Sequence, residues 1–430
     1  MFRRMAAVLA AVGGLALFLA LPALWNEAAQ RAEDSGQAPD GSIAASEFPS
    51  SIASATSAPA EPNAEYSPDS ELRGVWVSYL EWQGTDFSSE SAFRAEVRQM
   101  MQNIAALGAN TVFAHVRPFG DALYPSALFP FSHLCTGVQG QDPGFDPLAV
   151  LVEQAHAAGL ELHAWINPYR LRSGSTPASF CAESPAMTHP DWVRTAGNGQ
   201  FLDPSSAEVQ QYLADSLSEL CQNYSIDGIH FDDYFYPTTD PAFDAADYAA
   251  SGTSLSLEDW RRENVNALMR LCRAVAQKYG VVFSVSPQGS LTNCRDAQYS
   301  DAALWLAEPE YCDLVIPQLY WGRDYIKNGS RALALDTLAQ EWLTLPRCEE
   351  TSLAFGLAAS RIGEGDGGLS SGPGTEWCSG RALAEQITFL RAQGAGGTAV
   401  YRYDSLFSNT LYPTLAEQEA DALRAVWSAP

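Results

Sequence analysis

Two adjacent carboxylates, Asp232 and Asp233, end a short apolar segment and precede a run of aromatic residues in the stretch GIHFDDYFYP, residues 228–237. This pattern is typical of the end of a buried strand, where carboxylates are costly unless they are paired or used. In barrels and sheets of parallel strands, active sites gather at the carboxyl ends of the strands, and aromatic rings beside carboxylates suit carbohydrate chemistry. The stretch therefore predicts a sugar-cleaving enzyme.

Strand-like and helix-like segments alternate along the chain from residue 71 onward. Strand candidates begin at Arg73, Thr111, Leu160, Gly228, Val281, Asp313, Ser352 and Gly397. Helical segments include residues 91–107, 147–158, 207–224, 257–279, 331–345 and 380–393. This alternation predicts an α/β fold, a (β/α)8 TIM barrel over residues 71–430 with long loops at its C-terminal face. A doubly wound open sheet is the alternative, but no glycine-rich phosphate turn follows the first strand.

The period of two along a strand predicts which side chains enter the barrel. In the fourth strand His230 and Asp232 point inward, while Asp233 belongs to the rim or loop. The same rule places Phe113, His115 and Arg117 on one face of the second strand, and His163, Trp165 and Asn167 on one face of the third. The strand ends are predicted to add sugar-binding side chains to one mouth, namely Arg117, Asn167, Tyr169, Gln318, Tyr320, Trp321 and Tyr403.

Several of these residues also have a purely structural interpretation. His115 and His163 lie deep in their strands and are predicted to be hydrogen-bonded core histidines. Trp76 and Trp165 either fill the barrel interior or contact a ligand. Arg117 either pairs with one of the two carboxylates or binds substrate, since a buried charge needs an opposite one. The carboxylate pair itself could instead cap the following loop.

A glycosidase usually needs two carboxyl groups, about 5 to 9.5 Å apart depending on its stereochemistry. Asp232 is predicted to be one of them, with Asp233 as its nearest rival. Because neighbours on a strand point to opposite faces, these two are not expected to form the pair unless the strand breaks there. The second carboxylate is then expected from another loop, with four candidates: Asp121, Glu364, Asp366 and Asp404.

The N-terminus carries a targeting pattern. Two basic residues, Arg3 and Arg4, precede an uncharged apolar run from Met5 to Trp25. Residues 1–25 are predicted to be a signal peptide or membrane anchor, which places the rest of the chain outside the cytoplasm, secreted or anchored to the cell membrane. Residues 26–70 are rich in Ala, Ser, Pro and Glu and are predicted to form a disordered linker.

The amino-acid composition limits the kinds of partner and cofactor that the protein is expected to bind. A formal net charge of −26 makes nucleic acid or an anionic membrane surface unfavourable as a partner, so membrane contact is expected only through the N-terminal segment. None of the eight cysteines has metal-ligand spacing, and no metal or cofactor is predicted. Cys135 and Cys181 fall in successive loops and are the candidates for one disulfide. The oligomeric state is left open.

Six stretches of the chain resemble the motifs of the glycosyl hydrolase-like family 10 domain, in the family's order over about residues 71–325. They are ELRGVW (71–76), HVRPFGDALYPS (115–126), HAWINPYR (163–170), the stretch 228–237, WRRENVN (260–266) and PQLYW (317–321). The resemblance implies a (β/α)8 barrel of bacterial envelope proteins, some of which act as glycosidases on peptidoglycan strands stripped of peptides. This chain departs from the family at SPQGSL (286–291), where relatives usually carry a Ser-Pro-Phe-Gly-like motif followed by Trp. The lost rings imply a different subsite.

Two other families share part of the opening stretch. Residues 227–232 resemble the fourth-strand motif of family 18 chitinases, whose catalytic Glu would fall at Tyr234, so a substrate-assisted chitinase mechanism is disfavoured. The Phe-Asp-Asp triplet resembles metal-dependent polysaccharide deacetylases, but none of the six histidines has the His-x-x-x-His spacing that those enzymes need.

Two functions follow as expectations. The first is a glycoside hydrolase that cleaves a cell-wall polysaccharide, with peptidoglycan strands as the leading substrate, by two-carboxylate acid/base catalysis. The alternative is a catalytically weak glycan-binding barrel that scaffolds or localises at the cell envelope.

Overall fold

The computed structural model describes residues 71–369 and 371–429. The predicted N-terminal segment (1–25) and linker (26–70) lie outside the described residues. Within the described ranges, no helix is both long and apolar enough to cross a membrane.

Parallel strands form one sheet in the order β10-β9-β8-β7-β3-β2-β1-β12-β11. The two outer strands of this order, β10 and β11, are separated in the chain only by Ala354. They are two halves of one broken strand, of which β10 pairs with β9 and β11 pairs with β12, so the sheet closes and the eight predicted strand positions form a barrel. The (β/α)8 prediction is confirmed. The strands are β1 (Leu72–Val77), β2 (Thr111–Arg117), β3 (Glu161–Ile166), β7 (Gly228–Phe231), β8 (Val282–Val285), β9 (Leu314–Val315), β10 (Ser352–Leu353), β11 (Phe355–Ala358) and β12 (Gly397–Tyr401).

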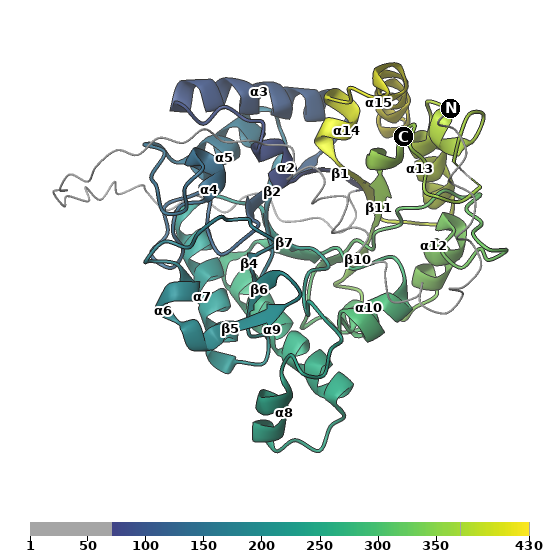
Figure 1. Cartoon of the computed structure of the whole chain (residues 1–430). Coiled ribbons are helices and arrows are strands. Elements are labelled where there is room, and N and C mark those ends of the chain that lie inside the picture. Colours follow the sequence, from purple (N-terminus) through teal and green to yellow (C-terminus); the bar gives the residue numbers. More distant parts are fainter. Residues whose placement is uncertain (1–70, 370, 430) are drawn as a thin grey trace, which may run out of the picture. The chain divides into compact units, whose positions relative to one another are not determined.

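Helices surround these strands (Figure 1). The six predicted helical segments appear as α3 (Glu90–Ala106), α5 (Pro147–Ala157), α7 (Ala207–Asn223), α9 (Leu257–Tyr279), α12 (Leu335–Leu343) and α13 (Ala382–Ala392). Their ends follow local chemistry: the Ser256 hydroxyl caps α9 by accepting from the Asp259 backbone, and Gly280 ends it with a φ of 68°. Further helices are α2 (Tyr79–Trp82), α4 (His133–Thr136), α6 (Pro185–Thr188), α8 (Ala245–Ser251), α10 (Leu291–Ala297), α11 (Ala302–Ala307), α14 (Tyr403–Phe407) and α15 (Pro413–Ser428).

Strand alternation divides the core as predicted for β7. Ile229 and Phe231 join the large apolar cluster between strands and helices, whereas His230 points into the barrel and accepts a hydrogen bond from Trp76 Nε1 at 3.1 Å. Trp76 and Trp165 belong to a separate interior cluster. The interior of the barrel is therefore filled by side chains, which leaves the space above this layer for any ligand.

The alternation fails at the end of β2. Phe113 joins the interior cluster, but the register between β2 and β3 shifts between His115 and Arg117, and this bulge turns the Arg117 side chain to the other side. Its guanidinium lies 4.2 Å from the centre of the Phe129 ring, and burial lowers its pKa. The prediction that Arg117 shares the inward face is therefore wrong.

An antiparallel sheet between β3 and α7 was not predicted. It consists of β4 (Arg170–Arg172), β5 (Val193–Ala196) and β6 (Gly199–Leu202). Arg194 fastens it through ion pairs with Asp203 at 2.6 Å and Asp247 of α8 at 3.1 Å. Since the chain enters this sheet just after β3 and leaves it before α7, it builds up the C-terminal face of the barrel. In Figure 1, α8 lies away from the strands of the barrel.

The predicted bridge between Cys135 and Cys181 does not form, because all eight cysteines are free. The two loops do meet, but through an amide: the Cys181 backbone N–H donates to Gln139 at 3.1 Å, and the Gln139 side chain donates to Asp121 at 3.1 Å. Hydrogen bonds thus join these loops where the sequence led us to expect a disulfide.

Candidate active site

Asp232 lies immediately after β7, and its side chain is turned toward the end of the neighbouring strand β3. Its Oδ2 accepts from Trp165 Nε1 at 3.1 Å and from the side-chain amide of Asn167. Its Oδ1 accepts from the Tyr234 backbone at 3.0 Å. Only 3% of Asp232 is exposed, so the carboxylate is held by protein donors rather than by water.

Arg170 is connected to Asp232 through Asn167. The Asn167 oxygen accepts from Arg170 Nη2 at 2.5 Å, while its nitrogen donates to Asp232. The guanidinium itself packs over aromatic rings, 4.6 Å from the Phe119 centre and 5.1 Å from that of Tyr234. Arg170 therefore acts on Asp232 through an intervening neutral amide and at a distance, not by a direct ion pair.

The environment of Asp232 favours its protonated form. Burial, and then the charge of Asp233, raise its pKa to about 7, while the Tyr234 backbone, Arg170 and Asn167 oppose this rise. A carboxyl group with a pKa near neutrality is suited to donate a proton at physiological pH.

Asp233 is turned toward the opposite neighbours, the ends of β8 and β9. Its Oδ2 accepts from Gln298 at 2.9 Å and from Gln288 at 3.3 Å, and its Oδ1 accepts from Gln318 at 3.3 Å. Burial raises its pKa, and the three glutamine amides counteract the rise. Gly289 lets these loops approach, because a Cβ there would lie 2.4 Å from the Gln318 carbonyl oxygen.

The two carboxylates lie at one mouth because β7 ends at Phe231. Strand alternation therefore no longer separates Asp232 from Asp233, and the side chains diverge toward β3 on one side and β8 and β9 on the other. Asp233 is half-buried, and the three glutamine amides hold its carboxylate at the mouth. The sequence allowed Asp232 and Asp233 to form a pair only if the strand broke there, and β7 does end just before them.

The histidines beneath the site are structural. His230 Nε2 accepts from Trp76, and its Nδ1 lies 2.8 Å from the Ser284 hydroxyl. Burial lowers the pKa of His230 and His115 well below the ordinary value and that of His163 to about 4. They are therefore neutral. The prediction of a hydrogen-bonded core histidine is confirmed for His163, whose Nδ1 lies 3.3 Å from the Ser284 hydroxyl, but it is wrong for His115, because both of its buried ring nitrogens lack a hydrogen-bond partner among the described residues.

Aromatic rings line the side of the mouth near β9 and β12. Tyr320 stacks on Tyr401 with ring centres 5.7 Å apart. Trp321 is half-buried and lies beside Tyr325, with ring centres 6.2 Å apart. Flat aromatic surfaces of this kind suit the apolar faces of sugars.

Other predicted site residues lie outside this group. Tyr169 is fully buried in the core between strands and helices. The Tyr403 hydroxyl accepts from Asn103 of α3 at 2.8 Å, and its ring packs on Phe407. Asn167 and Gln318 do lie at the mouth, but both donate to the carboxylates.

Most acids named as a possible second carboxylate have structural partners. Asp121 is fully buried and bonded to His133 and Gln139. Asp366 accepts from the Gly322 backbone at 2.8 Å and Trp377 Nε1 at 3.0 Å. Asp404 lies 3.4 Å from Arg402, whereas Glu364 is exposed in the glycine-rich loop.

Sequence reasoning missed a further buried acid, Glu81. It sits on α2 after β1, only 4% exposed, with Arg402 at 2.6 Å, and burial raises its pKa. The signal was available, because Ser78 and Glu81 have the spacing of a capping box, and both reciprocal bonds are present. Glu81 thus ties the end of β1 to the segment after β12.

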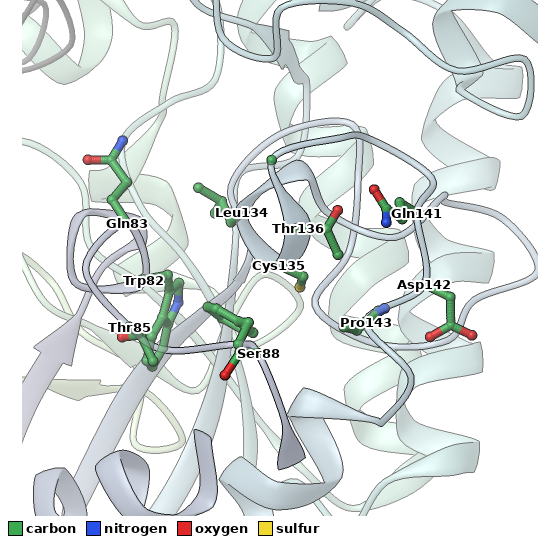
Figure 2. A pocket seen from close by; sticks show the side chains of 12 residues that line it. Trp82, Gln83, Thr85, Ser88, Leu134, Cys135, Thr136, Gln141, Asp142 and Pro143 are labelled. Carbon is green, nitrogen blue, oxygen red and sulfur yellow. The ribbon is translucent and has the colours of Figure 1, made fainter. Parts of the chain in front are cut away.

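Two hollows lie over the loops after β1 and β2, and neither is lined by Asp232 or Asp233. The larger, about 410 Å³, has Trp82, Leu134 and Cys135 among its lining residues, with polar groups such as Gln83 and Asp142 (Figure 2). The smaller, about 310 Å³, is lined mainly by residues 125–131. As for metals, the described residues contain no group of three or more His, Cys, Asp or Glu side chains that could hold an ion.

Curated relatives are similar to most of the barrel. The chain is 35% identical over 320 residues to glycosyl hydrolase YngK of Bacillus subtilis (strain 168), covering 68% of this chain and 62% of that protein. It is 34% identical over 333 residues to glycosyl hydrolase DigH of Escherichia coli (strain K12), covering 68% and 74%. The chain thus spans less than two thirds of the length of YngK.

Solved structures show the same fold. The glycoside hydrolase domain of PgaB (BpsB) from Bordetella bronchiseptica aligns with 84% of this chain and 99% of that domain, at 15% identity and a TM-score of 0.52. A β-galactosidase from the psychrophilic Marinomonas ef1 aligns with 84% of this chain and 62% of its own, at 11% identity and a TM-score of 0.52.

The family match runs from residue 71 to residue 367 and so includes Asp232, Asp233 and the glutamines that hold the latter. It extends past the motifs recognised in the sequence, into the loop after β11. The chain belongs to the glycosyl hydrolase-like 10 family.

Proposed function

We propose that this protein is a glycoside hydrolase that cleaves a cell-wall glycan, with peptidoglycan strands as its substrate and Asp232 and Asp233 as its catalytic carboxyls. The observation that carries the proposal is the pair itself. At the carboxyl end of β7, Asp232 has a pKa raised to about 7, beside a second carboxylate that neutral amides hold.

Other features support a sugar substrate. Tyr320, Tyr401 and Trp321 offer ring surface beside the carboxylates. Related proteins carry the name glycosyl hydrolase. The family resemblance, together with the apolar segment near the N-terminus, supports a location outside the cytoplasm, where wall polysaccharide is found.

The test is cleavage of peptide-free glycan strands by the purified full-length protein, followed as new reducing ends. Activity that disappears in Asp232→Asn, with an unchanged circular dichroism spectrum, supports the proposal. Glu350→Gln is the matched control, because that acid is exposed and precedes β10, at the end of the strands opposite the mouth. Strands that bind but are never cut would favour the glycan-binding barrel instead.

A further inference from the structure

Asp366, in the glycine-rich loop after β11, joins two segments of the chain. Its Oδ1 accepts hydrogen bonds from its own loop, from the Gly368 backbone N–H at 2.9 Å and from the Ser371 hydroxyl at 3.2 Å. Its Oδ2 reaches outside the loop and accepts from the Gly322 backbone N–H at 2.8 Å and from Trp377 Nε1 at 3.0 Å. Only 7% of Asp366 is exposed, so these protein donors, rather than water, hold both oxygens.

A second carboxylate holds the next residue of the segment after β9. Glu376 Oε2 accepts from the Arg323 backbone N–H at 2.7 Å, and its Oε1 accepts from Gln386 Nε2 at 2.8 Å. Two acids from the segment after β11 therefore fix consecutive backbone N–H groups, those of Gly322 and Arg323. Trp321 lies immediately before these two residues, so the backbone that carries its ring is held on the C-terminal side.

The glycine-rich loop also packs against the aromatic neighbour of Trp321. Gly368 lies directly on the Tyr325 ring, because a Cβ at this glycine would lie 2.5 Å from Tyr325 Cδ2. The Tyr325 ring in turn lies beside that of Trp321, with ring centres 6.2 Å apart. Since Tyr325 is buried and Trp321 is half-buried, the loop supports from within the ring that remains accessible at the mouth.

We propose that Asp366 is a positioning residue for glycan binding, which holds the Trp321 ring in place at the mouth through the Gly322 N–H. The inference rests on the proposed function, because it takes Trp321 to be a ring that stacks on sugar. A carboxylate accepts about four hydrogen bonds, and Asp366 already accepts from four protein groups. It therefore acts through Trp321 and not on the sugar itself.

Asp366→Asn tests this role, because an amide cannot replace the carboxylate here. Each oxygen of Asp366 accepts from two donors, so whichever way the amide turns, its NH2 group faces two donors and those bonds are lost. The KM of the full-length protein for glycan strands should rise by about threefold to tenfold, the usual scale of one aromatic contact, with kcat changed by less than about twofold. Asp366→Ser withdraws the acceptors without adding an NH2 group and should raise KM likewise, so it serves if the first variant does not fold.

Glu376→Gln is the matched control, because it removes the same charge from the same segment while its hydrogen bonds can be remade. Gln386 is fully buried, and its Oε1 has no hydrogen-bond partner in the part of the chain that the structure describes. By turning its own amide, Gln386 can accept from the NH2 group introduced at position 376, while the remaining oxygen there still accepts from Arg323. The KM should therefore stay within about twofold of the wild-type value.

Two further measurements separate positioning from a general loss of structure. In a Trp321→Ala background, Asp366→Asn should change KM by less than about twofold, because the ring that it positions is gone. The second measurement does not depend on activity: the protein is labelled with fluorotryptophan, and the fluorine NMR signal of Trp321 is assigned by its loss in Trp321→Phe. Asp366→Asn should shift or broaden this signal, whereas Glu376→Gln should leave it in place.

The contrary outcomes are distinct. A KM that stays at the wild-type value in Asp366→Asn, or that rises equally with and without the Trp321 ring, would overturn the positioning role. An equal rise in Glu376→Gln would assign the effect to the lost charge and overturn it as well. If the wild type cleaves no glycan while the Trp321 signal still responds to Asp366→Asn, the proposed function fails and the positioning of this ring by Asp366 stands.

Discussion

Trp165 Nε1 donates to Asp232 Oδ2 at 3.1 Å, which joins the interior of the barrel to the carboxylate at its mouth. One face of the indole is also fixed, because the His115 ring stacks on it with ring centres 3.8 Å apart and an interplanar angle of 6°. Trp165 was open to two interpretations, barrel filler or ligand contact. It fills the barrel and positions Asp232.

Removing the Asn167 amide should raise the pKa of Asp232. This amide stabilises the charged carboxylate, so Asn167→Ala favours the protonated acid, and the alkaline limb of the pH profile of kcat/KM should move to higher pH. Asn103→Ala, which removes a donor to Tyr403 away from the pair, is the control. An alkaline limb that stays in place in Asn167→Ala would show that this amide does not tune the acid.

Asp232→Asn should stabilise the fold more at pH 8 than at pH 4. The folded pKa of Asp232, about 7, lies above its ordinary value of about 4, so its folded state binds protons more tightly. The unfolding free energy of the wild type therefore falls as the pH rises from about 4 to about 7, and the contribution of Asp232 no longer changes at higher pH. One pKa unit is about 1.4 kcal/mol, so the difference in unfolding free energy between variant and wild type should grow by a few kcal/mol.

Urea unfolding at four pH values between 4 and 8 measures this difference, with Glu364→Gln as the control for loss of one acid. A difference that does not change with pH would mean that the pKa of Asp232 is not raised.

The buried ion pair between Arg261 and Asp244 should be important for stability. Both side chains are fully buried, and the guanidinium also donates to Tyr299 at 2.9 Å and to the Asp240 carbonyl at 2.8 Å. Arg261→Met leaves a buried carboxylate without its partner, which costs about 3 to 5 kcal/mol.

An exposed ion pair on another helix serves as the control. Arg381 and Glu385 form an i,i+4 pair whose side chains are 69% and 48% accessible, and Arg381→Met should cost less than about 1 kcal/mol. Denaturant unfolding compares the two variants. Equal losses would show that burial does not determine the strength of these pairs.

Trp321→Ala should weaken glycan binding more than it slows catalysis. Its half-buried ring offers stacking surface that contacts bound sugar before and during the reaction alike, so KM should rise while kcat changes little. Tyr403→Phe removes the hydroxyl that Asn103 contacts and should leave both constants unchanged. A kcat loss in Trp321→Ala that exceeds its KM change would assign the ring to the transition state.

The sequence predicted the barrel well, because eight strand and six helix positions follow from apolar periodicity and glycine stops. It failed where geometry departs from that periodicity. A bulge turned the Arg117 side chain to the other side of the strand, and the end of β7 at Phe231 allowed Asp233 to lie at the mouth beside Asp232. The small sheet of β4, β5 and β6 was missed because its strands are short and only partly buried.

The support of Asp233 was harder to foresee. Gln288 had been noted only as a departure from the family motif that implied a lost ring, and its amide proves to donate to Asp233. Gln298 follows a short helix and belongs to no motif, so only the folded chain reveals its role.

The glutamine amides around Asp233 also determine how the protein should respond to ionic strength. The glutamine donors are neutral and have no net charge for dissolved ions to screen, so salt should leave their hydrogen bonds to Asp233 intact. The chain's net charge of −26 acts on distant ions instead, over a screening length of about 8 Å at physiological salt. Salt can therefore change how readily an anionic glycan approaches this protein without changing the arrangement of the side chains around Asp233.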